Sequence, residues 1–493
     1  MQVKGKLSCH VCGHISATEV MTDKCCICGS PLGQIPPIVQ RPIDYETLLM
    51  NPWQCSICGN LYAGIVPPRI CPNCADGPSL LRENSSPKVT GRSAGEHILI
   101  IGSGIAGVTA AAQARITSDT CRITLIEREH ILPYYRINLT RYIAGDVIRD
   151  KLNIHPESWY AERDIQLVIG DVQFIHRLAK QVLLNSSQLV HYDKLIIANG
   201  SHAFVPAFPG GSKQGVFVFR TMDDAEKIIA RSEKGKSCIC IGGGILGIET
   251  ASALCKGGVE VTIVGGSGHL LSRQLPERAG QLLKEHLEKQ GVKVKCGVRV
   301  TEILGDRSVS GIRLSSGEEV MADFIIISAG IRPTTYLARE CGLSVNCGIV
   351  VNNSMQTSDA NIYAAGDVAE HEGRIYGLWR TSLSQGKVAG ICAAGGCASF
   401  MEVTTSNVVK VIDVGIFSIG EVSAVGVGYQ AFECGDHDRY IYLLSHDNYL
   451  VGAALYGDVK LAGTLRKAVD QHLALTDLIL INLAFSEVLK HPL

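Results

Sequence analysis

A glycine-rich loop that occurs twice constrains the fold of this chain more than any other feature. The first loop, Gly102–Gly107, follows the apolar segment His97–Ile101 and leads into the alanine-rich segment Ile105–Ile116. The second loop, Gly242–Gly247, also lies between an apolar segment and a helical one. The first glycine of such a loop permits a tight turn, and the second lets a pyrophosphate approach the backbone at the helix N-terminus. The repeat predicts two domains that each bind a dinucleotide.

The segments around each loop predict the same order of strand, helix and strand. Fully apolar strands of this kind are buried within parallel sheets. The two repeats are therefore expected to be doubly wound, Rossmann-like α/β domains, one inserted in the other. The expected strands and helices, in chain order, are His97–Ile101, Ile105–Ile116, Cys121–Ile126, Ser237–Ile241, Ile245–Lys256 and Val259–Val264.

After about residue 400 the pattern changes to short alternating segments. Tyr440–Leu444 and Leu450–Ala454 are typical of antiparallel strands. Asp458–Leu475 and Leu478–Leu489 are expected to be helices. This part of the chain is expected to form a small α+β domain.

Two pairs of CxxC turns precede the first glycine loop, and each pair has the same twelve-residue gap. Two such turns bring four thiolates onto one tetrahedral metal ion. The expected ligand sets are Cys9, Cys12, Cys25 and Cys28 for the first knuckle and Cys55, Cys58, Cys71 and Cys74 for the second. Thiolates at this spacing suit iron or zinc, and the spacing alone does not separate the two metals.

The surroundings of the second knuckle favour iron. Trp53, Gly59, Tyr62 and Pro72 accompany its cysteines, and together they resemble the short rubredoxin module of rubrerythrins. The first knuckle lacks the tryptophan, the tyrosine and the proline between its second pair of cysteines. Iron and structural zinc therefore both remain open for the first site.

Composition narrows the class of protein. The 493 residues exceed what a single core holds, so three or more domains are expected. A formal net charge of -1 gives no electrostatic reason to expect nucleic acid or an anionic membrane surface as a partner. No uninterrupted apolar run is long enough to span a bilayer, and the first residues form no apolar signal segment. Without a signal segment or a membrane span, the chain is expected to be cytoplasmic. Its nineteen cysteines are then in a reducing environment and are not expected to form a disulfide framework.

Seven motifs occur in an order that resembles one group of flavoproteins. They are Gly102–Gly107, Glu127, Pro133–Arg136, Leu195–Gly200, Gly242–Glu249, Ser328–Pro333 and Tyr363–Val368. The chain resembles the NAD(P)H:rubredoxin reductases, which are related to the N-terminal part of assimilatory nitrite reductase. The resemblance covers roughly residues 95–470. It implies FAD in the first dinucleotide domain and NADH or NADPH in the second.

The resemblance also assigns residues to each nucleotide. Asp367 is expected to hydrogen-bond the ribityl chain of FAD, and the amide of Val368 is expected to face the flavin ring. Glu127 ends a strand where a ribose hydroxyl needs an acceptor. The residues expected to hold FAD are Gly102, Gly104, Gly107, Glu127, Arg136, Ala198, Gly200, Asp367 and Val368. Those expected to hold the nicotinamide nucleotide are Gly242, Gly244 and Gly247. Gly330, in the motif Ser328–Pro333, is also expected to bind a cofactor.

Two further residues are expected to act in catalysis. Arg141 occupies the position at which relatives carry a lysine, and Glu249 closes the second loop. Because arginine stays charged and binds carboxylates in a bidentate way, we expect an Arg141–Glu249 ion pair. It could open when the nicotinamide binds, or it could be a fixed structural pair.

The choice between NADH and NADPH is left open by the strand after the second loop. This strand ends in Gly265 rather than in the acidic residue typical of NADH binding. Ser267, His269 and Arg273 are plausible contacts for a 2′-phosphate, but no arginine follows the strand directly. NADH or dual use is favoured on the family pattern.

The remaining question is where the electrons go. The expected helix Ile105–Ile116 contains no cysteine, and neither does Leu139–Tyr142, so the thiol exchange of related flavoproteins is disfavoured. A flavin can release electrons singly, which favours transfer to the second knuckle and on to a soluble acceptor. Candidate acceptors are rubredoxin, rubrerythrin, superoxide reductase or a flavodiiron protein. In the alternative, both knuckles are zinc ribbons that dock the flavoprotein in a larger redox complex.

The expected architecture is an α/β protein with two doubly wound domains, a small α+β C-terminal domain and two rubredoxin-like or zinc-ribbon-like knuckles. The expected boundaries are 1–34 and 51–78 for the knuckles, 95–212 and 336–400 for the FAD domain, 213–335 for the NAD(P) domain and 401–493 for the last domain.

Overall fold

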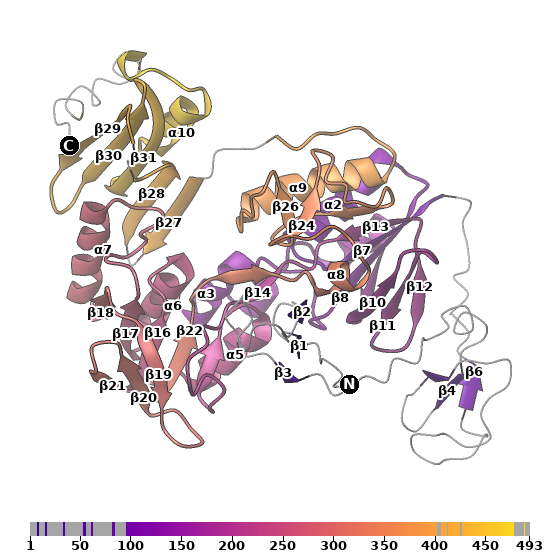
Figure 1. Cartoon of the computed structure of the whole chain (residues 1–493), viewed down its shortest axis with the longest axis horizontal. Helices are drawn as coiled ribbons and strands as arrows, with labels where there is room; N and C mark the ends of the chain where they lie inside the picture. The colour runs from indigo at the N-terminus through magenta and orange to yellow at the C-terminus, as the bar shows by residue number, and fades with distance from the viewer. Residues whose placement is uncertain are drawn as a thin grey trace, which may run out of the picture. The chain divides into compact units, whose positions relative to one another are not determined.

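The computed structural model describes residues 95–401, 406–411, 413–423, 426–477 and 488, together with six short strands before residue 95 (Figure 1). Those strands are β1 (Leu7–Ser8), β2 (Ile15–Ser16), β3 (Gly33–Gln34), β4 (Trp53–Cys55), β5 (Leu61–Tyr62) and β6 (Leu81–Glu83). The side chains of both predicted knuckles lie outside the described residues, and so does nearly all of the expected helix Leu478–Leu489. Within the described part of the chain, no helix is both long and apolar enough to cross a membrane.

The chain divides into two compact units and passes between them more than once, so two segments of the second unit are inserted in the first and a third segment follows it. The first unit comprises Met1–Tyr135, Asn153–Ser201 and Pro333–Phe400. The second unit comprises Arg136–Leu152, His202–Arg332 and Met401–Leu493.

The first unit is built around a five-stranded parallel sheet. Its strand order is β25 (Ile362–Ala364), β13 (Lys194–Ile197), β7 (His97–Ile101), β8 (Arg122–Glu127) and β9 (Ile165–Ile169). All five residues of β7 are buried, because this strand has neighbours on both edges and helices over the sheet. Strand β7 and the helix that follows therefore carry the first glycine loop on a fixed support.

Helices α2 (Ile105–Thr117) and α9 (Trp379–Ala393) pack against one another in this unit. They approach closely because small residues meet at the contact. A Cβ atom added to Gly386 would lie 2.3 Å from the carbonyl oxygen of Ala106, and one added to Gly390 would lie 2.2 Å from that of Ala110. The remaining elements of this part are α4 (Glu157–Glu162), β10 (Val172–His176), β11 (Gln181–Leu184), β12 (Leu189–His191), α8 (Tyr336–Glu340), β24 (Ile349–Val351) and β26 (Ala369–His371). Strands β14 (Ser201–Ala203) and β23 (Ile331–Pro333) pair with one another, and each spans a boundary between the two units.

The second unit repeats the plan of the first. Its parallel sheet has the order β15 (Val216–Val218), β22 (Phe324–Ile327), β16 (Ser237–Ile241), β17 (Glu260–Gly265) and β18 (Lys293–Cys296). The glycine loop again follows the central strand and leads into a helix, α6 (Ile245–Lys256). The other elements are η2 (Arg136–Asn138), α3 (Leu139–Ile143), η3 (Arg149–Lys151), α5 (Met222–Arg231), α7 (Glu277–Lys289), β19 (Val300–Leu304), β20 (Gly311–Leu314) and β21 (Glu319–Met321).

The last part of the chain forms an antiparallel sheet within the second unit. Its order is β27 (Ser406–Val411), β28 (Val414–Gly420), β31 (Tyr449–Gly457), β30 (Tyr440–His446) and β29 (Tyr429–Gly435). Helix α10 (Ala462–Asp470) packs on β28 and β31. The sheet is joined to α7 by the hydroxyl of Tyr456, which donates to the carbonyl oxygen of Leu282 at 3.2 Å.

The expected helix Asp458–Leu475 is shorter in the structure. Asp458 lies in a turn, where its carboxylate accepts from the backbone N–H of Lys460 at 3.0 Å. At the other end His472 has a φ of 50°, which ends the helix. Side-chain bonding in the turn and a left-handed residue therefore confine the helix to α10.

Candidate nucleotide-binding sites

The first glycine loop turns at the end of β7. Gly102 has a φ of 99°, and a Cβ atom added to it would lie 2.4 Å from the carbonyl oxygen of Ala198. A Cβ atom added to Gly107 would lie 1.9 Å from the carbonyl oxygen of Gly102. Only glycine fits these two positions, because a side chain would overlap backbone atoms.

The middle glycine of this loop faces open space. No atom lies within 4 Å of a Cβ added to Gly104, which is the N-cap of α2 and provides no side-chain cap. The first backbone N–H groups of α2 are thus left for an anion, which the helix dipole favours. Ser103 adds a buried hydroxyl that has no hydrogen-bond partner among the described residues. These features fit a pyrophosphate.

Further predicted FAD residues lie at the carboxyl ends of the neighbouring strands. Gly200, which follows β13, has a φ of 69° and open space where a side chain would be. The carboxylate of Asp367 accepts from the hydroxyl of Ser201 at 2.8 Å and from that of Ser382 at 3.4 Å. Val368 is fully buried. The first unit therefore brings Gly102, Ala198, Gly200 and Asp367 to one edge of its sheet, the edge at which such sheets bind ligands.

Three other predicted residues have different surroundings. Glu127 ends β8 as expected, and one of its carboxylate oxygens accepts from the backbone N–H of Glu129 at 2.6 Å. Arg136 belongs to the second unit, where its guanidinium donates to the carbonyl oxygen of Arg220 at 2.5 Å. Gly330 also belongs to the second unit and has a φ of 117°.

The second glycine loop repeats the geometry of the first. Gly242 has a φ of 134°, and its added Cβ would lie 2.3 Å from the carbonyl oxygen of Ser328. The added Cβ of Gly247 would lie 2.1 Å from the carbonyl oxygen of Gly242, and that of Gly244 would meet nothing within 4 Å. Gly244 is the N-cap of α6 and again supplies no side-chain cap. The loop thus fits a second pyrophosphate.

The expected ion pair between Arg141 and Glu249 is not formed in the structure. Glu249 accepts instead from the hydroxyl of Thr140, at 3.4 Å. Arg141 follows Thr140 directly in α3, so its side chain leaves the helix in another direction and is exposed. Burial raises the pKa of Glu249 to about 7, and the bond from Thr140 opposes this rise. The sequence did not single out Thr140, because only the packing of α3 on α6 reveals its contact.

The strand after the second loop ends without an acidic side chain, as the sequence states. Gly265 is the last residue of β17, and Gly266 and Ser267 follow it exposed. His269, one of the three residues considered for a 2′-phosphate, is directed inward. Its ring nitrogen Nε2 contacts the carbonyl oxygen of Leu275 at 3.0 Å.

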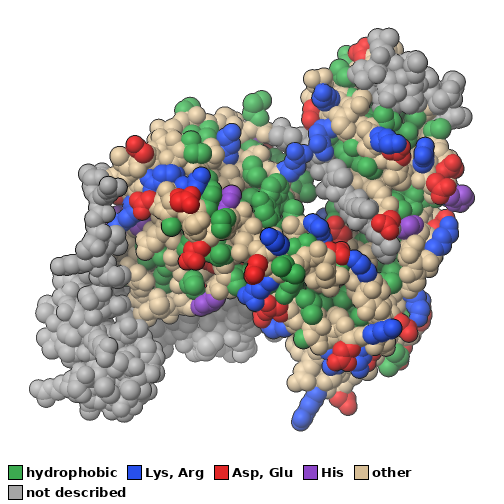
Figure 2. All heavy atoms as spheres, turned by 180° about the vertical axis from the view of Figure 1, so that it is seen from behind, with side chains coloured by type: hydrophobic (Ala, Val, Ile, Leu, Met, Phe, Trp, Pro, Cys, Tyr) green, Lys and Arg blue, Asp and Glu red, His purple; other side chains and the backbone are tan. Residues whose placement is uncertain are grey.

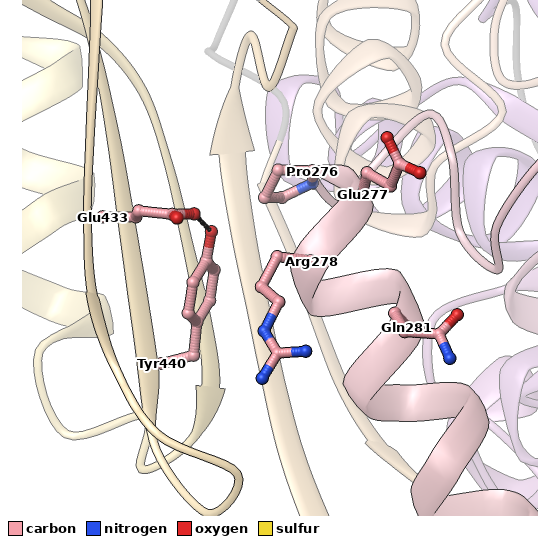
Figure 3. A pocket seen from close by; sticks show the side chains of 6 residues that line it. All are labelled: Pro276, Glu277, Arg278, Gln281, Glu433 and Tyr440. Carbon is pink, nitrogen blue, oxygen red and sulfur yellow. Dashed lines mark hydrogen bonds between the residues drawn. The ribbon is translucent and has the colours of Figure 1, made fainter. Parts of the chain in front are cut away.

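An open pocket of about 550 Å³ lies between α7 and strands β29 and β30 (Figure 3). Arg278 extends toward Tyr440, whose hydroxyl donates to the carboxylate of Glu433 (Figure 3). The other lining residues are Pro276, Glu277 and Gln281. The pocket contains none of the residues predicted to bind a nucleotide.

Known proteins match this chain over the stretch that contains both glycine loops. The model of the pyridine nucleotide-disulphide oxidoreductase family matches residues 96–386, which include the two loops. The chain belongs to this family. A second model, the C-terminal domain of rubredoxin NAD+ reductase, matches residues 406–473. The family supports FAD and NADH as the cofactors, in agreement with the open, uncapped helix ends at both loops.

Several relatives and solved structures are similar to the chain. The NADH-rubredoxin oxidoreductase of Clostridium acetobutylicum is 35% identical over 76% of this chain and 94% of that protein. Its crystal structure aligns with a TM-score of 0.68 over 79% of this chain and all of that one, at 34% identity. An NAD-dependent persulfide reductase from A. fulgidus aligns with a TM-score of 0.71 over 77% of this chain and 78% of that one, at 26% identity.

Longer relatives match only in part. A nitrite reductase of Bacillus subtilis that uses NAD(P)H is 34% identical over 74% of this chain but 46% of that protein. The chain spans about half the length of the nitrite reductases that it matches.

Proposed function

We propose that this chain is an FAD-dependent oxidoreductase that takes electrons from NADH or NADPH and delivers them to a rubredoxin-type iron site. That site is formed by Cys55, Cys58, Cys71 and Cys74. A soluble electron-acceptor protein such as rubredoxin receives the electrons from it. The observation that carries the proposal is the duplicated loop, since each copy leaves its middle glycine and the first turn of its helix open.

The chain's own groups divide into two binding sites. Backbone N–H groups at the start of α2 and α6 bind the two pyrophosphates, and the flanking glycines keep side chains out of their way. Asp367 and Glu127 supply carboxylate acceptors for hydroxyl groups of the flavin nucleotide. FAD supplies the ability to accept two electrons at once and to release them singly.

Glu249 is proposed to act on the nicotinamide side of the second loop. It lies two residues after Gly247 on α6, and its raised pKa lets it hold a proton near neutral pH. A neutral carboxyl group avoids a buried negative charge beside a reduced nicotinamide. Arg141 is exposed on the neighbouring helix α3. Its side chain is proposed to contact the nucleotide directly instead of forming an ion pair with Glu249.

The route out of the flavin is proposed to be a metal rather than a disulfide. Helix α2 holds no cysteine, and neither does α3, so the chain lacks the redox thiols expected at these places in disulfide reductases. Relatives at 34–35% identity are named rubredoxin reductases. Iron in the second knuckle and either iron or zinc in the first are proposed on the sequence pattern.

The proposal is tested by titrating the full chain with NADH under anaerobic conditions, after its flavin, iron and zinc have been quantified. We expect the visible bands of the ferric tetrathiolate to bleach together with those of the flavin. A variant with Cys71→Ser and Cys74→Ser should keep flavin reduction and lose the iron bands.

Two results would contradict the proposal in different ways. Zinc in both knuckles would support docking ribbons in their place, and a ferric site that stays oxidised beside a reduced flavin would remove the internal transfer. A flavin that neither NADH nor NADPH reduces would reject the oxidoreductase itself.

A further inference from the structure

A cationic side chain lies beside the residues that follow β17. The nearest atoms to a Cβ added to Gly266 are Cγ and Nε of Arg299, at 3.5 and 3.9 Å. Arg299 comes from the segment between β18 and β19, more than thirty residues later in the chain. In doubly wound domains the end of this second strand is where the adenosine ribose is recognised. The structure therefore places a guanidinium at the recognition point that Gly265 leaves without a carboxylate.

The backbone holds this arginine in place. The N–H of Gly297 donates to the carbonyl oxygen of Ser267 at 2.7 Å, and that of Val298 donates to the carbonyl oxygen of Gly265 at 3.3 Å. On the other side, Ser315 bonds Arg299 twice. Its hydroxyl accepts from the N–H of Arg299 at 3.2 Å, and its own N–H donates to the carbonyl oxygen of Arg299 at 2.8 Å. The position of Arg299 beside Gly266 is thus built into the fold of the second unit.

The guanidinium of Arg299 has no anionic partner among the described residues. Its side chain is exposed and forms no ion pair with any residue that the structure describes. Three carboxylates on the strands and turn that follow have other cations as partners. Glu318 pairs with Lys295 at 2.8 Å, and Glu302 and Glu319 both pair with Arg313.

We propose that Arg299 binds the 2′-phosphate of NADPH, so that the second site accepts the phosphorylated dinucleotide at least as well as NADH. The inference rests on the proposed function, because it requires a nicotinamide nucleotide at the second loop. Gly265 removes the carboxylate that would accept from a ribose hydroxyl and repel a phosphate. The guanidinium of Arg299 binds the phosphate oxygens through charge-assisted hydrogen bonds, which arginine forms in a planar, bidentate way.

The rival residues considered from the sequence are less suited to this role. The ring of His269 is directed toward the carbonyl oxygen of Leu275. Arg273 is exposed, but no contact in the structure places it beside Gly266. Sequence reasoning did not find Arg299, because the contact joins two segments that are distant in the chain.

The test is calorimetric binding of adenosine 2′,5′-bisphosphate and of 5′-AMP to the flavin-loaded full chain. We expect the bisphosphate to bind at least about 10-fold more tightly, since a charged hydrogen bond of this kind changes affinity by roughly 10- to 100-fold. Arg299→Ala should abolish the difference by weakening bisphosphate binding, and Arg299→Lys should restore part of it. Arg307→Ala, an exposed arginine on the turn between β19 and β20, is the matched control.

The converse variant is Gly265→Glu. A Cβ atom added to Gly265 would lie 3.7 Å from its nearest neighbours, the backbone of Gly243, which is ordinary contact, so the first atom of the side chain fits. It should favour 5′-AMP and NADH by restoring the carboxylate. Equal binding of the two ligands to the unchanged protein, or loss of bisphosphate binding in Arg273→Ala but not in Arg299→Ala, would overturn the inference and leave the dinucleotide site intact. Failure of both ligands to bind would reject the second site and the proposed function together.

Discussion

The two doubly wound units have the same backbone arrangement around their central strands. In the first, Asp193 precedes β13 and its carboxylate accepts from the backbone N–H of His97, at the start of β7, at 2.7 Å. In the second, Asp323 precedes β22 and accepts from the N–H of Ser237, at the start of β16, at 2.8 Å. The glycine loops at the other ends of β7 and β16 also match. The repeat thus extends over the whole length of the central strands.

The units differ where a ligand has to be distinguished. The strand next to the central one ends in Glu127 in the first unit and in Gly265 in the second. The shared geometry suits what two dinucleotides have in common, namely the pyrophosphate. Glu127 and Gly265 are proposed to lie where the two nucleotides differ, so the loops would recognise any dinucleotide and these two positions would distinguish one from another.

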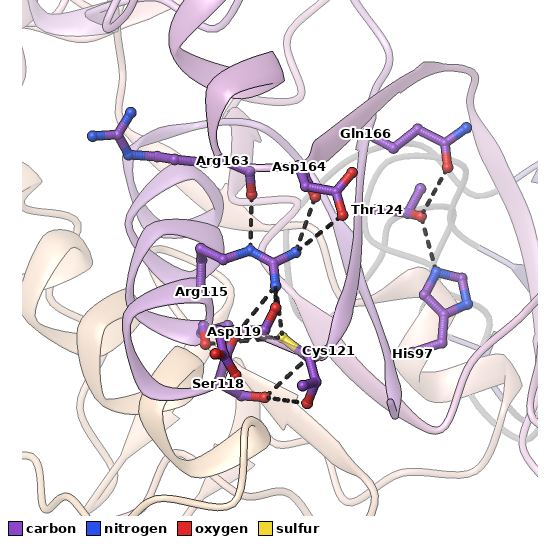
Figure 4. Close-up of polar contacts among 11 residues, drawn as sticks. His97, Arg115, Ser118, Asp119, Cys121, Thr124, Arg163, Asp164 and Gln166 are labelled. Carbon is purple, nitrogen blue, oxygen red and sulfur yellow. Dashed lines mark hydrogen bonds and ion pairs between the residues drawn. The ribbon is translucent and has the colours of Figure 1, made fainter. Parts of the chain in front are cut away.

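The units also differ in how the helix after the loop ends. In the first unit the guanidinium of Arg115 donates to four carbonyl oxygens, those of Ser118 and Asp119 just after α2 and those of Arg163 and Asp164 just after α4 (Figure 4). In the second unit glycines end α6. Gly258 has a φ of 85°, and its N–H donates to the carbonyl oxygen of Cys255 at 2.9 Å. Arg115 thus bonds the segments that follow two helices, whereas the left-handed Gly258 closes the last turn of α6.

The largest effect should come from the first glycine of each loop. Gly102→Ala forces a methyl group against the carbonyl oxygen of Ala198 at a positive φ, which should destabilise the first unit by roughly 3–5 kcal/mol. The protein should then purify without flavin. Gly242→Ala should have the same effect on the second unit, retaining flavin and losing reduction by NADH. Flavin content and NADH reduction measured on both variants check this, and loss of flavin from Gly242→Ala would show that the two loops are not independent.

Removing the side chain of Arg115, whose hydrogen bonds are drawn in Figure 4, should have the next largest effect. Arg115→Ala leaves four carbonyl oxygens without a charged donor, among them those of Asp119 and Arg163, and should lower the free energy of unfolding by about 2–4 kcal/mol. Gly258→Ala, at the corresponding place in the second unit, should lower it by only about 1–2 kcal/mol. Urea unfolding of both variants measures the difference. Equal losses would mean that the side chain contributes no more than the backbone turn.

The sequence predicted the repeated elements closely and the side-chain contacts poorly. Strand β7 and helix α6 have the bounds expected from the sequence, because an apolar run, a glycine loop and a helical segment are local signals. The expected Arg141–Glu249 pair is not formed in the structure, since the direction of a side chain on α3 depends on how that helix packs. Arg299 was missed for the same kind of reason. The metal sites of the two knuckles stay predictions.

Surface charge was also well described by composition. On the described residues of the face in Figure 2, acidic and basic side chains are interspersed, with no large area of one sign. This matches a formal net charge of -1. The distribution gives no preference for a strongly charged partner on that face, so recognition of the proposed electron acceptor would depend on local contacts.

The stability of the two units should depend differently on pH, because a buried histidine begins the central strand of the first unit and a serine begins that of the second. His97 is buried, and its ring contacts the hydroxyl of Thr124 at 2.9 Å (Figure 4). Its other ring nitrogen contacts the guanidinium of Arg122 at 2.6 Å. Burial, with the nearby charge of Arg122, lowers the pKa of His97 to about 4. Its ordinary pKa is 6.5, so the unfolded chain binds the extra proton first as the pH falls. The contribution to stability is complete above pH 6.5 and is lost as the pH falls toward 4, by up to about 3 kcal/mol.

The variant His97→Gln checks this dependence. Its free energy of unfolding should fall less than that of the unchanged protein between pH 7 and pH 4.5, because the group that titrates has been removed. Ser237→Ala, at the matching position of the second unit, should leave the acid response unchanged. An acid response that His97→Gln does not alter would assign it to carboxylates instead.

The smallest effect on stability should come from the middle glycine of each loop. Gly104 and Gly244 have extended backbones and open space around an added Cβ, so alanine at either position should change the free energy of unfolding by no more than about 1 kcal/mol. The added methyl group would nevertheless occupy the space in which a pyrophosphate approaches the helix. Gly104→Ala should therefore weaken flavin retention and Gly244→Ala should weaken binding of the nicotinamide nucleotide, each in a folded protein. Flavin occupancy after dialysis and calorimetric titration with NADH measure the two losses. Unchanged affinity in both variants would mean that the open space is not where the nucleotides bind, because the same methyl group that leaves the fold intact would then also leave the ligands intact.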